Sequence, residues 1–321
     1  MQANRTWWVI GGVTLLILCI LPQVITAPYA MHLLNLAGIF AILTLGLNFL
    51  WGWTGLLSLA TAAFWAIGSY TSALLAVNLH VPFWLALPAA AVVATACGIV
   101  MGYPILRLRG HYLAMATLGY NIIVVLVLIN WDEFTHGGDG ITGIPSPAIG
   151  AFQFDTDNRF FYLILAALVL LMIAAVRAKA SRLGRALHAI RESEIAAEAM
   201  GIHTHHLKIL AFALSAFYSG VAGSLYAHVT MYISPDIFNF LESARILVML
   251  LIGGSGSIIG AVIGGVILTF LPEALRFMAS WYMAIYGAGI ILLIVYMPSG
   301  ITGLITRLAR RYEKEHFVVP I

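Results

Sequence analysis

Nine long apolar runs fill most of this 321-residue chain, and they restrict its fold more than any other feature. A helix that crosses a membrane needs about 20 mostly apolar residues. The runs lie at about 7–25, 29–50, 54–77, 81–106, 111–131, 160–178, 206–230, 242–271 and 281–297. Only 9% of the residues are charged, against about 25% in a soluble domain. So few charges cannot cover a soluble globule of this length, and the bilayer must be the solvent for much of the surface.

We expect these runs to be helical. Backbone polar groups inside the hydrocarbon must pair within the protein, so a spanning segment is a helix or a strand of a closed barrel. The runs are continuous and lack the alternation of apolar and polar residues that a barrel strand needs. We therefore predict an all-α polytopic membrane protein with a single transmembrane domain over 1–321. We interpret the first run as a retained helix, with a signal peptide over 1–28 as the alternative.

Lysine and arginine gather in three places at the ends of apolar runs, so the net charge of +3 does not indicate a nucleic-acid surface. The three clusters are Arg107 with Arg109, then Arg177, Lys179, Arg182, Arg185, Arg191 and Lys208, and finally Arg307, Arg310, Arg311 and Lys314. An excess of basic residues marks cytoplasmic loops. We therefore predict that the loop 179–205 and the tail 298–321 are cytoplasmic and that the acidic loop 132–159 faces outward. Counting the crossings backward places the N-terminus in the cytoplasm as well.

The run 242–271 does not fit this alternation as a single span, because both of its ends must face outward. Its centre is a series of Gly and Ser from Gly253 to Ser257, so we predict two half-helices joined by a glycine break, and eight full spans plus this hairpin. A broken helix at membrane depth must be buried in protein or line a cavity. Small and polar residues here and in 46–61 either line a translocation path, where the chain unwinds, or let helices pack closely. These path candidates are Asn48, Thr54, Ser58, Thr61, Gly253, Gly254 and Ser255.

The loop 181–201 is rich in Ala, Glu, Arg and Leu, which are strong helix formers. Its apolar residues, such as Leu183, Leu187 and Ile190, recur at roughly helical spacing, and Gly201 is placed to end a helix. We predict a short amphipathic helix on the cytoplasmic face. Such a helix buries its apolar stripe either on lipid or on a protein partner, and periodicity alone does not separate the two.

Four stretches resemble the permease subunits of branched-chain amino acid ABC importers, specifically the M-type subunit. They are Gly46 to Gly55 with Ser58 and Ala62 to Phe64, Leu106 to Gly119, Gly184 to Gly201, and Leu250 to Gly260. They occur in the order that the family shows, from about residue 40 to 300. The chain departs from the usual coupling-loop pattern of importers at Ile195, where a glutamate is expected, although Ala196, Ala197 and Gly201 fit it.

The resemblance implies a bacterial inner-membrane transporter that works through partners. A second, related permease would complete the membrane unit, two ATPase subunits would grip it from the cytoplasm, and an extracytoplasmic binding protein would deliver branched-chain or related amino acids. The chain has no Gly-Lys dipeptide and so no phosphate-binding loop, and we expect ATP to be bound by the partner subunits and no cofactor by this chain. The residues that the resemblance assigns to ATPase coupling are Gly184, Arg185, Ala186, Ile190, Arg191, Glu194, Ala196, Ala197, Glu198 and Gly201.

Two groups of residues are candidates for contact with the binding protein. Gly137, Gly138 and Gly140 lie in the outer loop, where glycines otherwise mark a cluster of turns. Glu242 and Arg245 lie three residues apart at the outer end of the hairpin. They form either an ion pair on one helix face or a contact with the binding protein or a substrate carboxylate.

Other functions remain as alternatives. A permease of the same class would carry urea, short amides or aromatic carboxylates, and the residues do not separate these cargoes. A stand-alone carrier driven by ions usually keeps an ionisable residue in mid-membrane, and this chain shows almost none away from helix ends. No catalytic constellation supports an intramembrane enzyme. His203, His205 and His206 lack Cys or acidic partners at ligand spacing, so we expect no metal site.

Overall fold

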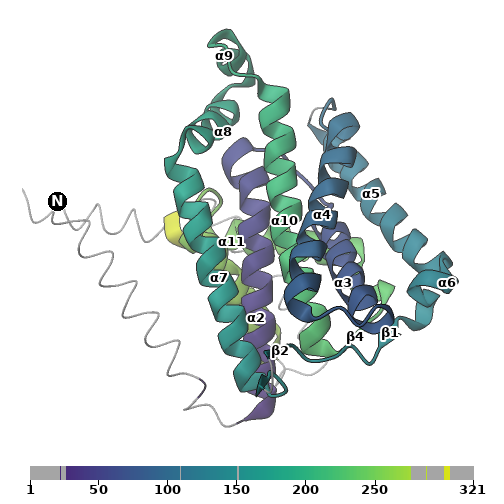
Figure 1. Ribbon diagram of the computed structural model, residues 1–321. Coiled ribbons are helices and arrows are strands. Elements are labelled where there is room, and N and C mark those ends of the chain that lie inside the picture. The colour runs from purple at the N-terminus through teal and green to yellow at the C-terminus, as the bar shows by residue number, and fades with distance from the viewer. Residues whose placement is uncertain are drawn as a thin grey trace, which may run out of the picture.

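The computed structural model describes residues 27–108, 110–149 and 152–275, together with 22, 287 and 300–303. They form a bundle of long helices with two small two-stranded sheets at one end (Figure 1). Apart from residues 22 and 287, the predicted runs 7–25 and 281–297 lie outside the described residues, as does most of the tail 298–321.

Five helices in the described part of the chain are long and apolar enough to cross a membrane. They are α2 (Pro28–Leu47) with its π-helical extension η1 (Asn48–Gly52), α4 (Phe83–Ile105), α5 (His111–Asn130), α7 (Asp157–Ala180) and α10 (Thr204–Thr230). The first and the last are mostly buried within the bundle, whereas the other three have most of their residues on its outside. The protein is therefore an all-α polytopic membrane protein, as predicted.

The remaining elements are shorter and connect or brace the long helices. They are the helices α3 (Thr61–Asn78), α6 (Asp132–Thr135), α8 (Arg182–Glu192), α9 (Glu194–Ala199), α11 (Phe240–Gly253) and α12 (Ile258–Ala274), the 3₁₀ turns η2 (Gly137–Asp139) and η3 (Pro235–Phe238), and the strands β1 (Ile141–Thr142), β2 (Ala148–Ile149), β3 (Phe152–Gln153) and β4 (Tyr232–Ile233). β1 pairs with β4 and β2 with β3, both antiparallel.

From α4 onward, successive long helices run in opposite directions along the bundle, and α2 runs in the same direction as α4, with α3 between them. α8 and α9 lie at one end and the strands at the other (Figure 1). α4 and α7 run toward α8 and α9, while α5 and α10 run away from them. This alternation fits the one that the loop charges predict, with α8 and α9 on the predicted cytoplasmic side.

Helix α10 lies at the centre of the bundle because small residues let its neighbours come close. A Cβ atom on Gly223 of α10 would lie 2.4 Å from the carbonyl oxygen of Trp65 in α3. Gly98 of α4 lies against Ala216 of α10 in the same way, with 2.7 Å between its ideal Cβ and that of the alanine. In lipid, where apolar surface gains little from leaving the solvent, such close van der Waals packing holds helices together.

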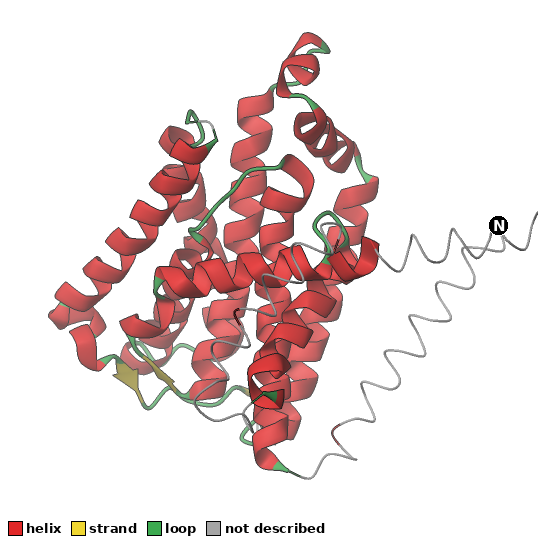
Figure 2. Cartoon of the chain, turned by 180° about the vertical axis from the view of Figure 1, so that it is seen from behind, coloured by secondary structure: helices red, strands yellow, loops and turns green. Residues whose placement is uncertain are grey.

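The predicted helix 54–77 is wrong in its first part. α3 begins at Thr61, and residues 55–60 form an extended connection from η1, seen crossing the back of the bundle in Figure 2. Gly55 has a φ of +73°, a left-handed conformation that glycine adopts readily and that ends the helix before it. The hydroxyl oxygen of Thr117 accepts a hydrogen bond from the N–H of Leu59 at 3.0 Å. Within the predicted path segment 46–61, only residues 55–60 are therefore unwound, since 46–54 are helical.

The predicted break in 242–271 is confirmed. α11 ends at Gly253 and α12 begins at Ile258, and between them Gly254 and Gly256 have φ values of +113° and +86°. β4 precedes α11 at the strand end of the bundle, and α12 returns to that end, where the Tyr29 hydroxyl donates to the Glu273 carboxylate at 2.7 Å. The segment therefore enters and leaves the bundle at one end.

The close approach of α3 and α10 predicts a stability difference between two glycine substitutions. Gly223→Ala places a methyl group against backbone atoms of Trp65 and Ser69, so we expect a loss of about 1–3 kcal/mol and a lower melting temperature in detergent. Gly119→Ala, on α5, meets no atom within 4 Å and should change stability by less than about 1 kcal/mol. Equal melting temperatures for the two variants would contradict this account of the core.

Candidate functional site

The predicted coupling segment folds as two helices rather than one. α8 and α9 meet at Ser193, whose backbone is extended with φ −161° and ψ 113°. Its hydroxyl oxygen accepts a hydrogen bond from the N–H of Ala196 at 3.2 Å, which makes Ser193 the N-cap of α9. A single helix through 181–201 is therefore wrong at this residue, because serine competes with the helix for backbone hydrogen bonds.

Gly201 ends α9, as predicted. Its φ is +81°, its N–H donates to the carbonyl of Glu198 at 2.9 Å, and the N–H of Ile202 donates to the carbonyl of Ala197 at 3.0 Å. These two bonds form a Schellman motif, which needs a left-handed residue at this position. The direction in which the chain turns from α9 into α10 therefore depends on glycine.

Two carboxylates hold α9 against the start of α10. Glu194 forms an ion pair with Lys208, whose side chain is only 6% exposed. Glu198 accepts a hydrogen bond from the Thr204 hydroxyl at 2.6 Å. Separating a buried charge from its partner is costly, so α9 and α10 are expected to move together. Helical spacing in the sequence could not predict the pairing of Lys208 with Glu194, because the two residues lie in different helices with a turn between them.

The side of α9 away from α10 is apolar and exposed. Ile195 is 78% exposed and Met200 is 83% exposed, with the exposed Ala196 and Ala199 beside them. Exposed apolar side chains on a helix at the end of a bundle mark a surface that another protein or a membrane covers.

The ten residues assigned to coupling separate by burial. Gly184, Ile190 and Ala197 are buried, Ala186 and Glu194 are half-buried, and Arg185, Arg191, Ala196, Glu198 and Gly201 are exposed. Gly184 is buried because the end of α7 crosses it, and a Cβ there would lie 2.3 Å from the Lys179 carbonyl oxygen. The buried members therefore fix α8 and α9 to the bundle, whereas contact of the exposed members with a partner stays a prediction.

η1, the glycine break, α7 and α8 meet at one place, which we call the junction. The junction consists of Asn48, Gly52, Lys179, Arg191 and Gly256. The side-chain oxygen of Asn48 accepts a hydrogen bond from the N–H of Gly256 at 2.8 Å. Arg191 donates to the carbonyl of Gly52, and Lys179 donates to the carbonyl of Gly256 at 2.8 Å. The predicted path residue Asn48 thus binds the predicted break, and the coupling residue Arg191 reaches the end of η1.

Unpaired carbonyls explain why two cations lie at the junction. Carbonyls at the end of a helix and within a break have no helical partner, and they carry partial negative charge. Lys179 and Arg191 supply donors to these groups from the end of α7 and from α8. Gly256 leaves room for this approach, since a Cβ there would lie 3.1 Å from a guanidinium nitrogen of Arg191.

His188 of α8 borders the junction, and its ring lies 5.8 Å from that of Trp53. Burial lowers the pKa of His188 below its ordinary value, and the positive charges of Lys179 and Arg191 lower this pKa further. The imidazole is therefore neutral at pH 7 and adds no third cation beside the junction.

The other predicted path residues make local contacts. The hydroxyl of Thr54 donates to the carbonyl of Leu50 at 2.6 Å, and that of Ser58 accepts from the N–H of Ala60 at 3.3 Å. Within the described ranges, the buried Thr61 hydroxyl has no hydrogen-bond partner. A role for these hydroxyls in a path stays a prediction.

In the break itself, the predicted path residues Gly253 and Gly254 are buried and Ser255 is half-buried. The carbonyl of Gly253 accepts a hydrogen bond from the Thr302 hydroxyl at 2.9 Å. The break is thus covered by protein on this side, and its role in a path also stays a prediction.

The outer-loop glycines serve first as turns. Gly137 and Gly140 are buried and have positive φ, and a Cβ on Gly140 would lie 2.1 Å from the carbonyl oxygen of Ile233. Gly138 is exposed, with no atom near its ideal Cβ. Contact of this loop with a binding protein stays a prediction.

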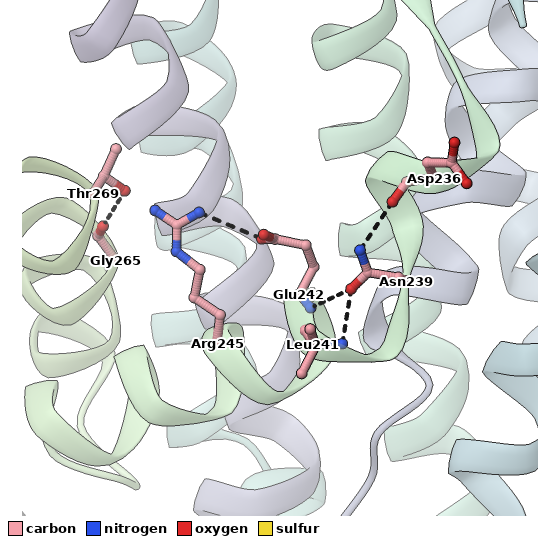
Figure 3. A network of polar contacts seen from close by, with 7 residues as sticks. All are labelled: Asp236, Asn239, Leu241, Glu242, Arg245, Gly265 and Thr269. Carbon is pink, nitrogen blue, oxygen red and sulfur yellow. Dashed lines mark hydrogen bonds and ion pairs between the residues drawn. The ribbon is translucent and has the colours of Figure 1, made fainter. Parts of the chain in front are cut away.

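Glu242 and Arg245 form an ion pair at 3.5 Å on α11, where that helix crosses α2 (Figure 3). The Arg245 guanidinium lies 4.9 Å from the centre of the Phe40 ring. Phe40 is twelve residues from each end of the span Pro28–Gly52, so the pair lies halfway along it. Sequence analysis placed this pair at the outer end of the hairpin, because the sequence does not show that α11 begins near the middle of the span.

The histidines at the start of α10 pack against one another, with ring centres 6.0 Å apart for His203 and His206. Among the described residues, no three His, Cys, Asp or Glu side chains gather in a way that could hold a metal ion.

Comparison with known proteins supplies the family. The family described as "Branched-chain amino acid transport system / permease component" matches residues 29–295. The high-affinity branched-chain amino acid transport system permease protein LivM of Escherichia coli (strain K12) is 36% identical over 312 residues, which cover 90% of this chain and 73% of LivM.

More distant relatives belong to the same class. LivH of Salmonella typhimurium is 27% identical over 84% of this chain and 92% of its own length. The autoinducer 2 import system permease protein LsrC of Salmonella paratyphi B is 28% identical over 79% of this chain and 75% of its own length. No solved structure matches the chain significantly. The family match covers most of the bundle described above, and this chain therefore belongs to the permease components of branched-chain amino acid transport systems.

Proposed function

We propose that this chain is one of two permease subunits of an ABC importer that moves branched-chain or related amino acids inward. The junction carries this proposal, because it joins α8 directly to two interruptions in the membrane helices. A loop that only connects two spans has no need of such contacts. The similarity to LivM, which is named for branched-chain amino acids, supports the substrate.

An exposed surface and the similarities to other permeases support the proposed partners of this chain. The exposed apolar face of α9, with Ile195 and Met200, is the proposed contact for a separate ATPase subunit. The similarity to both LivM and LivH supports a related second permease as the other half of the membrane unit. The outer loop 132–159 faces an extracytoplasmic binding protein, both termini are cytoplasmic, and the whole chain has eight spans plus the hairpin.

The contacts suggest how ATPase motion reaches the membrane helices. The ion pair between Glu194 and Lys208 ties α9 to α10, which is the centre of the bundle. Arg191 ties α8 to Gly52 at the end of η1. Displacement of α8 and α9 by closing ATPases would therefore pull on α10 and on the junction together. Glycines 254 and 256, with positive φ, are positioned to absorb the change as a hinge.

Uptake measurements test the proposed substrate. The importer, assembled with its second permease, ATPases and binding protein in liposomes, is expected to accumulate labelled leucine, isoleucine or valine when ATP is supplied. Uptake of urea, short amides or aromatic carboxylates instead would assign the chain to another cargo of the same class. Transport by this chain alone, without ATPases, would identify a secondary carrier.

Substitutions at the junction test the coupling route. Arg191→Gln removes the charge-assisted bond to Gly52, so we expect uptake to fall by about tenfold while ATP hydrolysis by the assembled importer continues. Arg182→Gln removes an exposed charge from the same helix and is the matched control, expected to change uptake by less than about twofold. Equal effects of the two substitutions would remove the junction from the coupling route.

Two substitutions in α9 test the coupling helix itself. Gly201→Pro cannot adopt a φ of +81° and loses the N–H that donates to Glu198. Glu198→Arg loses the hydrogen bond from Thr204 and reverses the charge. Both variants should insert into the membrane but show ATP hydrolysis uncoupled from uptake. Normal uptake in both would exclude α9 as the coupling element.

A further inference from the structure

A charged pair halfway along a membrane span is costly and needs a reason. Glu242 and Arg245 lie beside Phe40, twelve residues or about 18 Å from either end of α2 with η1. Ionisable residues at such depth usually face a substrate pathway or pair with one another. Here they pair, and within the part of the chain that the structure describes their contacts leave much of their bonding capacity unused.

The pair is loose for two opposite charges. Its nitrogen and oxygen are 3.5 Å apart, whereas a charge-assisted hydrogen bond is about 2.7–2.9 Å long. Among the described residues, the buried Oε2 atom of Glu242 accepts no hydrogen bond. A guanidinium has five N–H donors, and the guanidinium carbon of Arg245 lies over the Phe40 ring. Both side chains are also partly open, with 25% of Glu242 and 29% of Arg245 exposed.

The end of α11 is already satisfied by its own cap. The Asn239 side-chain oxygen accepts hydrogen bonds from the N–H groups of Leu241 and Glu242 at 2.9 and 3.3 Å (Figure 3). The Glu242 carboxylate is therefore not needed to cap this helix. The Oε2 atom of Glu242 is buried against Arg245, so the exposed part of the Glu242 side chain and the spare donors of Arg245 stand together on one turn of the helix, beside the exposed apolar side chains of Phe240 and Leu241.

We propose that Glu242 and Arg245 form a subsite for the charged groups of a zwitterionic α-amino acid during its passage, an inference that rests on the proposed function. The substrate carboxylate binds the Arg245 guanidinium and the substrate ammonium binds the Glu242 carboxylate. In an α-amino acid, one carbon separates the ammonium from the carboxylate. This close spacing matches Glu242 and Arg245, which form a loose pair on one turn of α11. The apolar side chain of the substrate then lies against Leu241, whose own side chain is exposed.

Charge balance favours this class of substrate over the other cargoes of related permeases. The pair has no net charge and neither has the zwitterion, so their complex adds no net charge at the middle of the span. An uncharged cargo, such as urea or a sugar-like molecule, has no group that requires both charges. A substrate with a single charge would leave one member of the pair without a counterion, and that is costly at this depth.

The test separates a substrate subsite from an ion pair that only stabilises the fold. The double variant Glu242→Met with Arg245→Met removes both charges, so no unpaired charge remains to disturb folding. In the assembled importer with leucine-loaded binding protein, we expect ATP hydrolysis to persist while leucine uptake falls by more than tenfold. Uptake at the rate of the unchanged importer would overturn the proposal.

A matched control removes one basic and one acidic side chain elsewhere in the molecule. Arg182 and Glu192 are both exposed on α8, and replacing both with Met should leave uptake within about twofold. An equal loss of uptake in this control would show that the effect of removing two opposite charges is not specific to α11, and it would overturn the proposal.

Arg245→Lys decides the question if the double variant does not assemble. Lysine keeps the positive charge and the ion pair but loses the planar fork that binds a carboxylate with two hydrogen bonds. We expect its uptake rate to fall at least threefold with saturating loaded binding protein, and an unchanged rate would overturn the proposal. If the unchanged importer moves no zwitterionic amino acid, the proposed function fails and the subsite fails with it.

Discussion

Every interruption of a helix within a membrane leaves backbone groups that must find partners in the protein, and this requirement organises the molecule. Two interruptions lie next to each other, at the end of η1 and in the break before α12. Asn48, Lys179 and Arg191 supply the missing partners. Lys179 and Arg191 come from the ends of α7 and α8. These helix ends are therefore attached to the two interruptions in the membrane helices.

Close packing of small residues makes rigid units of the helices that these contacts join. Gly223 and Gly98 bring α3 and α4 against α10, and Gly265 brings α12 against Ala41 of α2. Packed helices tend to shift as units rather than bend continuously. The proposed hinges are then the glycines with positive φ, at 55 and in the break. Rigid packing and local hinges therefore occupy different residues of the same helices.

The sequence predicted the class of protein, the long helices, the break before Ile258 and the stop at Gly201, because hydropathy and glycine placement are local signals. It did not predict the late start of α3 at Thr61 or the division of α8 from α9 at Ser193. Apolar composition is the same in a helix and in the extended segment 55–60, and a capping serine resembles any polar residue of a helix. The pairing of Lys208 with Glu194 depends on tertiary contact, for which a single sequence carries no periodic signal.

Helix α11 connects the two functional features. Arg245 lies eight residues before Gly253, so one rigid segment of about 12 Å separates the ion pair from the break. Gly256 in that break is bound by Lys179 and by Asn48. A movement of α8 that shifts the junction reaches α11 through the proposed hinge at Gly254 and Gly256, and the part that the hinge does not absorb displaces α11 along or about its axis. Such a displacement changes the position of Arg245 over the Phe40 ring and hence the distance between the two charges. The same helix that receives motion from the predicted cytoplasmic side would in this way open or close the proposed subsite, with no separate relay between them.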